Sequence, residues 1–190
     1  VARLIGLPYP GGPHISKLAE KWRAEHADPS SAEQHRLFTL PRPMLHTKDY
    51  NFSFSGLKTA ALYAVRDKLA DPAQNGAPLS DPQKESLAAE FEQAVVDTLL
   101  HKTKRALEEY AAKTLIIGGG VIANSFIRKS FADMCEMHGV RLLVPEKDLS
   151  TDNATMIGLV AYFQVRDGKA GLNPDSAEFA ELRADGNLGL

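Results

Sequence analysis

The sequence predicts an α/β fold that is rich in helix and contains one parallel strand–helix–strand unit. Residues 114–117 suit a strand and run into three glycines, and a short apolar run bounded by glycine is typical of a buried parallel strand. A helical pattern follows over residues 124–138, and residues 141–145 form a second apolar run. Because the two runs flank one helix, we expect ligands to bind beyond the carboxyl ends of the strands.

Helices dominate the part of the chain before this unit. Residues 1–6 resemble the end of a helix, and the chain starts at Val1 without a methionine, so we expect upstream sequence to be missing. After a turn rich in proline and glycine, residues 14–24 show the periodicity of an amphipathic helix. Residues 37–40 are predicted to form a short strand.

The stretch over residues 49–58 alternates aromatic and small polar residues. The alternation favours an edge strand, followed by a helix over 56–69 that Ser53 or Ser55 caps. Residues 71–82 are polar and rich in Pro, Asn and Gly, which predicts a mobile surface loop.

The longest periodic segment covers residues 83–112. Lys102, Lys104 and Arg105 lie near its C-terminal end, where they either complement the helix dipole or bind RNA, and the first interpretation is favoured. Apolar residues recur at helical steps in this segment, which predicts one buried face: Leu87, Phe91, Val95 and Leu99.

Polar residues at 149–154 precede an apolar helix that is predicted over 155–165. Ser150, Thr151 or Asp152 is its expected N-cap. Asp152 follows the second strand, so we expect it to share one cleft with the glycine turn. Taken alone, a carboxylate in a polar turn is more often an N-cap than a metal ligand.

The domain organisation predicted from these patterns is one lobe over residues 1–165 and a loosely ordered tail over 166–190. The predicted core consists of Phe91, Val95, Leu99, Leu115, Ile117, Ile127, Leu143, Ile157 and Val160.

Composition indicates a packed globular protein. The chain has 190 residues, of which 44% are apolar and 24% are charged, and its formal net charge is −2. Bulk charge therefore does not attract nucleic acid, and any RNA contact needs a local basic patch. Cys135 is the only cysteine, which excludes an internal disulfide and a cysteine zinc site and suits a cytoplasmic protein. No apolar run approaches the ~20 residues that span a membrane.

The glycine turn at 118–120 is the main candidate site. Glycine lets the backbone approach a ligand closely, and N–H groups at the start of the following helix attract anions. The turn is either a nucleotide-binding site or an ordinary strand-to-helix connection. Its sequence matches neither Gly-x-Gly-x-x-Gly nor a P-loop. The chain also lacks a His-x-x-x-His motif and a Gly-x-Ser-x-Gly elbow, so neither zinc-protease nor serine-elbow chemistry is supported.

Short motifs occur in family-like order: Pro-Gly-Gly-Pro at 10–13, Phe-Ser-Phe-Ser-Gly-Leu-Lys at 52–58, Gly-Gly-Val-Ile-Ala-Asn at 119–124 and Ser-Thr-Asp-Asn-Ala at 150–154. With these motifs the chain closely resembles, from Val1 to about Val165, the C-terminal part of the bacterial TsaD (Gcp or YgjD) family. The resemblance implies an actin, Hsp70 and sugar-kinase (ASKHA) fold, with two lobes around a nucleotide cleft. It also implies transfer of the threonylcarbamoyl group from threonylcarbamoyl-adenylate to the tRNA adenosine beside the anticodon, which makes t6A.

The resemblance implies roles for individual residues. Gly12 and Asn124 would contact the nucleotide-like substrate, threonylcarbamoyl-adenylate or ATP. The backbone of Gly119 and Gly120 would approach this substrate closely. Asp152 would be a ligand of a divalent metal ion, iron or zinc, together with two histidines of an upstream His-x-x-x-His motif that this chain lacks. No catalytic side chain is implied, because the transfer needs mainly positioning and charge stabilisation.

The chain also departs from the family pattern. A Ser-Gly-Gly phosphate segment and an aspartate expected before Val1 are absent, so we expect the chain alone to be inactive. Gly118 stands where alanine is common, and Ser16 stands where an acidic residue is common. The implied partners are tRNA and subunits like TsaB and TsaE, without a membrane.

Two alternatives accompany this interpretation. The first is a related carbamoyltransferase, of the hydrogenase-maturation or antibiotic type, against which the motif at 52–58 argues. The second is a non-catalytic partner such as TsaB, which shares the fold. Asp152 and Asn124 argue against the second, because a scaffold does not need a metal ligand.

Overall fold

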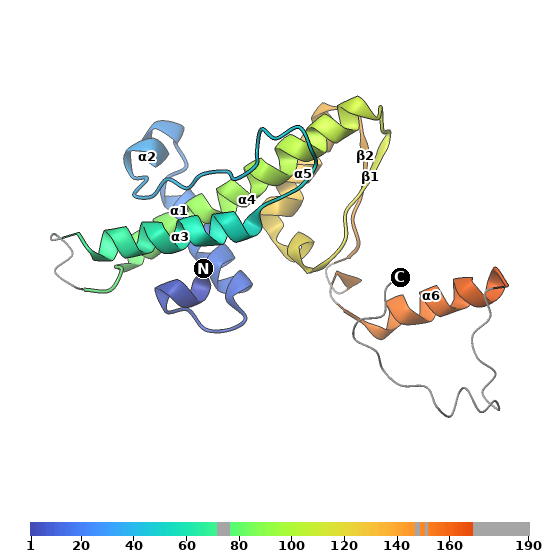
Figure 1. The fold of residues 1–190 in the computed structure, drawn as a ribbon, viewed down its shortest axis with the longest axis horizontal. Helices are drawn as coiled ribbons and strands as arrows, with labels where there is room; N and C mark the ends of the chain where they lie inside the picture. Colours follow the sequence, from blue (N-terminus) through green and yellow to red (C-terminus); the bar gives the residue numbers. More distant parts are fainter. Residues whose placement is uncertain (72–76, 147–148, 151, 169–190) are drawn as a thin grey trace, which may run out of the picture. The chain divides into compact units, whose positions relative to one another are not determined.

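The chain divides into two compact units, Val1–Pro145 and Glu146–Leu190, called here the first and the second unit. In the first unit, helices lie next to a two-stranded sheet (Figure 1). The computed structural model describes residues 1–71, 77–146, 149–150 and 152–168.

One long helix, α4 (Asp81–Glu109), organises the first unit. The 3-10 helix η1 (Ala2–Ile5), α1 (Gly11–Glu25) and α3 (Phe54–Leu69) form one core with the N-terminal half of α4 (Figure 1). The most deeply buried apolar side chains of this first core are Ala19, Leu40, Leu57, Ala61, Leu87, Ala88 and Ala94.

The predicted long helix is confirmed, but its buried face is not purely apolar. Leu87 is fully buried, whereas Phe91, Val95 and Leu99 are only partly buried. Buried carboxylates occupy other positions of α4. Removing the partner of a buried charge is strongly destabilising. Each of these carboxylates pairs with a cation from another part of the chain: Glu85 with Lys21, Glu90 with Arg42 and Glu92 with Arg23.

The predicted amphipathic helix near the N-terminus is confirmed as α1. It is longer than the predicted 14–24, and its apolar face is buried through Ile15 and Ala19. After α1, Asp28 caps a short helix that sequence reasoning missed, α2 (Pro29–Gln34).

Residues 37–40 do not form the predicted strand. Phe38 and Leu40 are buried, as the apolar pattern requires. The backbone of this segment, however, bonds to side chains of α4, and the N–H of Leu40 donates to Glu90 Oε1 at 2.8 Å. Helix side chains therefore satisfy polar backbone groups that a neighbouring strand would otherwise have to satisfy.

The predicted edge strand before α3 is also wrong. α3 begins at Phe54, and Ser53 is its N-cap, because Ser53 Oγ accepts a hydrogen bond from Gly56 N–H at 3.3 Å. The rings of Phe52 and Phe54 stack with their centroids 5.7 Å apart. The alternation of aromatic and polar residues thus occurs at the start of a helix. A helix start, unlike an edge strand, needs no partner strand.

The predicted strand–helix–strand unit is confirmed. β1 (Thr114–Ile116) and β2 (Arg141–Leu143) pair in parallel, residue for residue from their first positions. The 3-10 helix η3 (Gly120–Ala123) and α5 (Ser125–Met137) connect the strands. The connection packs with the C-terminal half of α4 in a second core, whose buried side chains are Val96, Leu107, Ile122, Ile127, Phe131, Met134 and Cys135.

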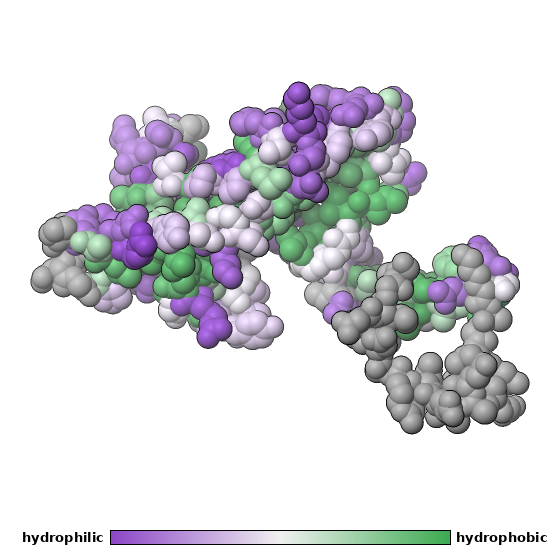
Figure 2. All heavy atoms as spheres, in the orientation of Figure 1, coloured by the Kyte–Doolittle hydropathy of each residue, from purple (hydrophilic) through white to green (hydrophobic). Residues whose placement is uncertain are grey.

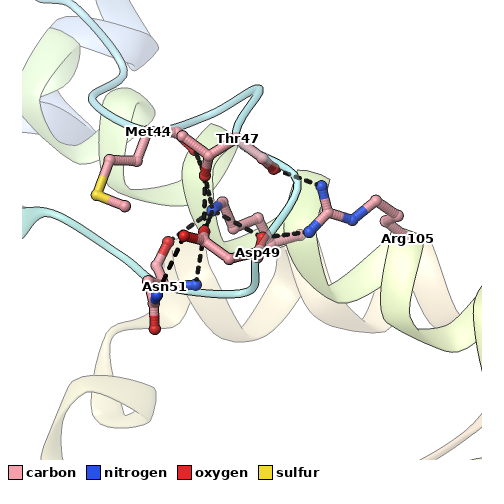
Figure 3. A network of polar contacts seen from close by, with 6 residues as sticks. Met44, Thr47, Asp49, Asn51 and Arg105 are labelled. Carbon is pink, nitrogen blue, oxygen red and sulfur yellow. Dashed lines mark hydrogen bonds and ion pairs between the residues drawn. The ribbon is translucent and has the colours of Figure 1, made fainter.

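The cations near the C-terminal end of α4 hold a polar loop that precedes α3 (Figure 3). Lys102 is only 1% exposed, and its Nζ donates to Thr47 Oγ1 at 2.8 Å and to Asn51 O at 2.6 Å. It also forms an ion pair with Asp49, at 3.2 Å. Arg105 donates to the backbone oxygens of Thr47, at 2.7 Å, and Asp49. Loop oxygens thus engage Lys102 and Arg105, while Lys104 pairs with Glu108 on the same helix. The dipole interpretation of these cations is wrong, because the last turn of α4, where the dipole acts, contains no basic residue.

The described part of the second unit contains α6 (Ala154–Arg166). Asn153 is its N-cap and accepts a backbone N–H with its side chain. The predicted caps Ser150 and Asp152 are therefore wrong, and Thr151 lies outside the described residues.

Part of the predicted core is exposed. Ile157 is 73% exposed and Val160 is 52% exposed, because α6 buries no side chain. Leu143 is 38% exposed, since alternate residues of β2 point away from the second core. Residues 169–190 of the predicted tail and residues 72–76 of the predicted loop over 71–82 lie outside the described residues, whereas Arg166 ends α6.

Candidate functional site

The glycine turn after β1 has a backbone that only glycine adopts readily. Gly119 has φ 88° and ψ 166°, a region of backbone space that is essentially restricted to glycine. A Cβ atom added at Gly118, Gly119 or Gly120 would meet no atom within 4 Å. The turn therefore borders open space, and its occupation by a nucleotide stays a prediction.

Asn124 ends the turn and begins α5. Its Oδ1 accepts a hydrogen bond from Ile127 N–H at 2.9 Å, which makes Asn124 the N-cap of the helix. Its Nδ2 donates to Ser16 Oγ at 2.7 Å and to Glu92 Oε1. Both ends of the amide are thus engaged, so Asn124 has a structural role besides the ligand contact expected from the sequence.

Glu92 on α4 connects α1 with the start of α5. Its side chain is only 3% exposed and also accepts a hydrogen bond from Ser16 Oγ at 3.0 Å. Arg23 forms an ion pair with the second carboxylate oxygen, and its guanidinium lies 3.8 Å from the ring centroid of Phe126. Sequence reasoning missed Glu92, because a glutamate next to an apolar helix stripe usually faces solvent.

An open pocket of about 210 Å³ lies beside this network. This volume is below the ~300–1,000 Å³ of pockets that hold drug-sized ligands, so it suits one part of a ligand, such as a sugar or a base. Cationic, anionic, hydroxyl and aromatic side chains all contribute to its lining: Ser16, Glu20, Arg23, Glu92, Ser125, Phe126 and Lys129.

Gly12 lies in the first turn of α1 and is exposed. It precedes Ser16 by four residues, so both lie on one face of the helix. Ser16 contacts Asn124, and η3 joins Asn124 to the glycine turn. The structure thus places Gly12, Gly119, Gly120 and Asn124 in one region of the first unit.

Asp152 lies in the second unit and is exposed. Its predicted place in the same cleft as the glycine turn stays a prediction. No group of three or more His, Cys, Asp or Glu side chains that could hold a metal ion occurs in the described part of the chain. A single exposed carboxylate is not a sufficient ligand set, so the described residues alone do not fit a metal centre.

Over residues 1–159 the chain matches the TsaD family model, described as tRNA N6-adenosine threonylcarbamoyltransferase. The chain belongs to the TsaD family. Each residue to which the sequence resemblance gave a role lies within the range matched by TsaD: Gly12, Gly119, Gly120, Asn124 and Asp152.

Curated relatives named tRNA N6-adenosine threonylcarbamoyltransferase are similar to most of this TsaD-family chain. The Thermosipho melanesiensis protein is 39% identical over 93% of this chain and 47% of its own length. The Variovorax paradoxus protein is 42% identical over 89% of this chain and 43% of its own length. The Staphylococcus aureus JH9 protein is 35% identical over 100% of this chain and 48% of its own length. The chain therefore spans about half the length of the curated relatives it matches.

No helix that is long and apolar enough to cross a membrane occurs among the residues that the structure describes.

Proposed function

We propose that this chain is part of a tRNA N6-adenosine threonylcarbamoyltransferase and forms one wall of the site for its adenylate donor. The observation that supports the proposal is the contact of Asn124, at the end of the glycine turn, with Ser16, which follows Gly12 by four residues on α1.

In the proposed reaction, the N6 amine of the tRNA adenosine attacks the carbamoyl carbon of threonylcarbamoyl-adenylate. A C–N bond forms, the bond from that carbon to the phosphate oxygen breaks, and AMP and a proton leave. This chain would bind and orient the nucleotide part of the donor. The glycine turn permits close approach, and the network around Glu92 holds Asn124 in one orientation.

We further propose the ASKHA fold for the complete enzyme, with residues 1–165 as its C-terminal lobe and 166–190 as a tail. A divalent metal, iron or zinc, would polarise the carbamoyl group of the donor. Asp152 would be one ligand, and histidines outside this chain would be the others. This chain would supply only one side of the donor site and one ligand of the metal. We therefore expect this chain alone not to modify tRNA. The proposed setting is the cytoplasm, with tRNA and subunits like TsaB and TsaE as partners.

The first experiment separates the cap role of Asn124 from its ligand role. Serine is also a good N-cap, so Asn124→Ser keeps the cap on α5 but removes the amide. Losing one hydrogen bond to a ligand costs about 0.5–1.5 kcal/mol, so calorimetry with ATP or AMP should show affinity reduced about 2- to 12-fold. The melting temperature should fall only in part, because the cap on α5 is kept while the amide's hydrogen bonds to Ser16 and Glu92 are lost.

Asn153→Ser is the matched control, because Asn153 caps α6 in the same way and the family resemblance gives it no ligand contact. It should leave nucleotide affinity unchanged. If Asn124→Ser lowers the melting temperature and leaves affinity unchanged, Asn124 is only a structural cap and the proposed site is wrong.

A further inference from the structure

Outside the candidate site, paired aromatic rings follow the C-terminal half of α4. The pairs have centroid separations of 5.3 Å for His46 and His101, 6.1 Å for Tyr50 and Tyr110, and 5.7 Å for Phe52 and Phe54. Tyr110 is 69% exposed, and Phe52 and Phe54 are each 42% exposed. We call this the ring surface, and it consists of His46, Tyr50, Phe52, Phe54, His101 and Tyr110.

Two cations of α4 hold these rings in place. Lys102 bonds to the backbone oxygen of Asn51, next to Phe52, and its Nζ lies 6.0 Å from that ring. The guanidinium of Arg105 lies 4.5 Å from the ring of Tyr50. The ring surface is therefore preorganised, which lowers the entropy cost of binding a partner.

The surroundings of the ring surface are polar and mainly cationic. Over the upper end of α4, where the loop crosses it in Figure 1, Figure 2 shows mostly purple and pale spheres. Lys48 and Lys58 are exposed and form no ion pair with any residue that the structure describes. Exposed or partly exposed basic side chains outnumber acidic ones in residues 46–58 and 101–113, without the buried Lys102: Lys48, Lys58, Lys104, Arg105 and Lys113 against Asp49, Glu108 and Glu109.

We propose that the ring surface binds an unpaired loop of RNA. Unstacked bases stack on Phe, Tyr and His rings, and lysines beside the rings neutralise the phosphates. A protein partner fits less well, because lysine is depleted at protein interfaces. Resting on the proposed function, the ligand would be the anticodon loop of tRNA, and the local basic patch would offset the formal net charge of −2.

The test measures binding of the 190-residue chain to a labelled RNA stem–loop by fluorescence anisotropy. The same RNA annealed to its complement is the second probe. The chain should bind the stem–loop more tightly than the duplex, because only the loop has bases free to stack. Phe52→Ala and Phe54→Ala should each reduce stem–loop affinity between about 5- and 150-fold. Lys48→Gln should lower the slope of log affinity against log salt by about one.

Tyr63→Ala is the matched control, because Tyr63 is a 50% exposed aromatic residue of α3 that lies outside the ring surface. It should leave RNA affinity unchanged. Phe52→Leu keeps the apolar bulk without an aromatic face, so it tests stacking even if the alanine variants fail to fold.

Equal binding of stem–loop and duplex, or unchanged affinity in Phe52→Leu, would overturn the inference. So would sedimentation showing that Phe54→Ala abolishes self-association while RNA affinity stays the same, because the surface would then be a protein interface. The nucleotide titrations with Asn124→Ser are independent of this test. Nucleotide affinity that Asn124→Ser leaves unchanged, with the expected RNA binding, counts against the proposed function alone. Reduced nucleotide affinity in that variant, with equal binding of stem–loop and duplex, counts against the ring surface alone.

Discussion

At the scale of single residues, Glu92 connects the parts of the candidate site. Its buried carboxylate accepts hydrogen bonds from Ser16 on α1 and Asn124 at the start of α5, and it pairs with Arg23. Burying a carboxylate is unfavourable unless it is paired and hydrogen-bonded, and these contacts meet both needs. Glu92 therefore sets the orientation of Asn124 and of one cation that lines the pocket.

The first prediction concerns Glu92→Gln. Glutamine keeps the shape but removes the charge, which leaves Arg23 without its partner. Urea unfolding should show a loss of about 1–3 kcal/mol. Glu108→Gln on the same helix is the control, because the pair of Glu108 with Lys104 at 3.9 Å is exposed, and its removal should cost under ~1 kcal/mol. Equal losses in the two variants would mean that Glu92 has no special structural role.

The second prediction concerns Asp49. Hydrogen bonding from the Thr47 hydroxyl and then from Lys102 lowers the pKa of Asp49 from 3.8 to about 2. A lowered pKa in the folded state means that the ionised carboxylate stabilises the loop above pH 3.8. This stabilisation is lost as pH falls through about 2.

Carbon NMR of the Asp49 carboxyl group should give a titration midpoint near 2. Thr47→Ala should move the midpoint toward 3.8, because it removes the main cause of the shift. Thr59→Ala is the control, since that hydroxyl bonds to Ser55 O on α3. A midpoint near 3.8 in the unaltered chain would contradict the loop network.

At the scale of elements, the turn between β1 and α5 depends on backbone conformation more than on space. No atom lies within 4 Å of a Cβ added at Gly118 or Gly119, but only Gly119 has a positive φ. Gly119→Ala should therefore lower the free energy of unfolding by about 1–3 kcal/mol, as measured in urea. Gly118→Ala is the matched control and should have little effect. Similar destabilisation in both variants would show that the turn adopts another conformation.

At the scale of the whole molecule, the first unit has two apolar cores that α4 connects, because α4 contributes side chains to both. Cys135 reports on the second core, since it is 1% exposed and the chain has no other cysteine. Burial raises the pKa of the Cys135 thiol, which lowers the fraction of reactive thiolate at neutral pH.

The fourth prediction is that Cys135 reacts with a thiol reagent only after unfolding. If α4 makes the two cores cooperative, the urea midpoint of thiol labelling should coincide with that of helix loss in circular dichroism. Labelling of the urea-denatured chain provides the maximal rate. Fast labelling of the native chain would instead show that the second core opens by itself.

The sequence alone determined those elements whose backbone hydrogen bonds lie within one segment or one local unit. Periodicity predicted α1, α4 and α5, and glycine after an apolar run predicted the turn that follows β1. The strand at 37–40 and the edge strand in the stretch 49–58 were predicted wrongly, because a strand requires a partner that a short pattern does not reveal. In the structure, a helix side chain and a helix cap satisfy these backbones instead.

Motifs in the sequence also predicted roles for Gly12, Gly119, Gly120, Asn124 and Asp152, and these roles stay predictions. Only the tertiary structure decided which charged residues are buried and what they contact. Glu92 meets Ser16 and Asn124, and Lys102 meets Asn51, across separations of many residues. Helical periodicity does not distinguish a buried glutamate or lysine from a solvent-facing one, because the distinction depends on a partner that folding brings from elsewhere in the chain.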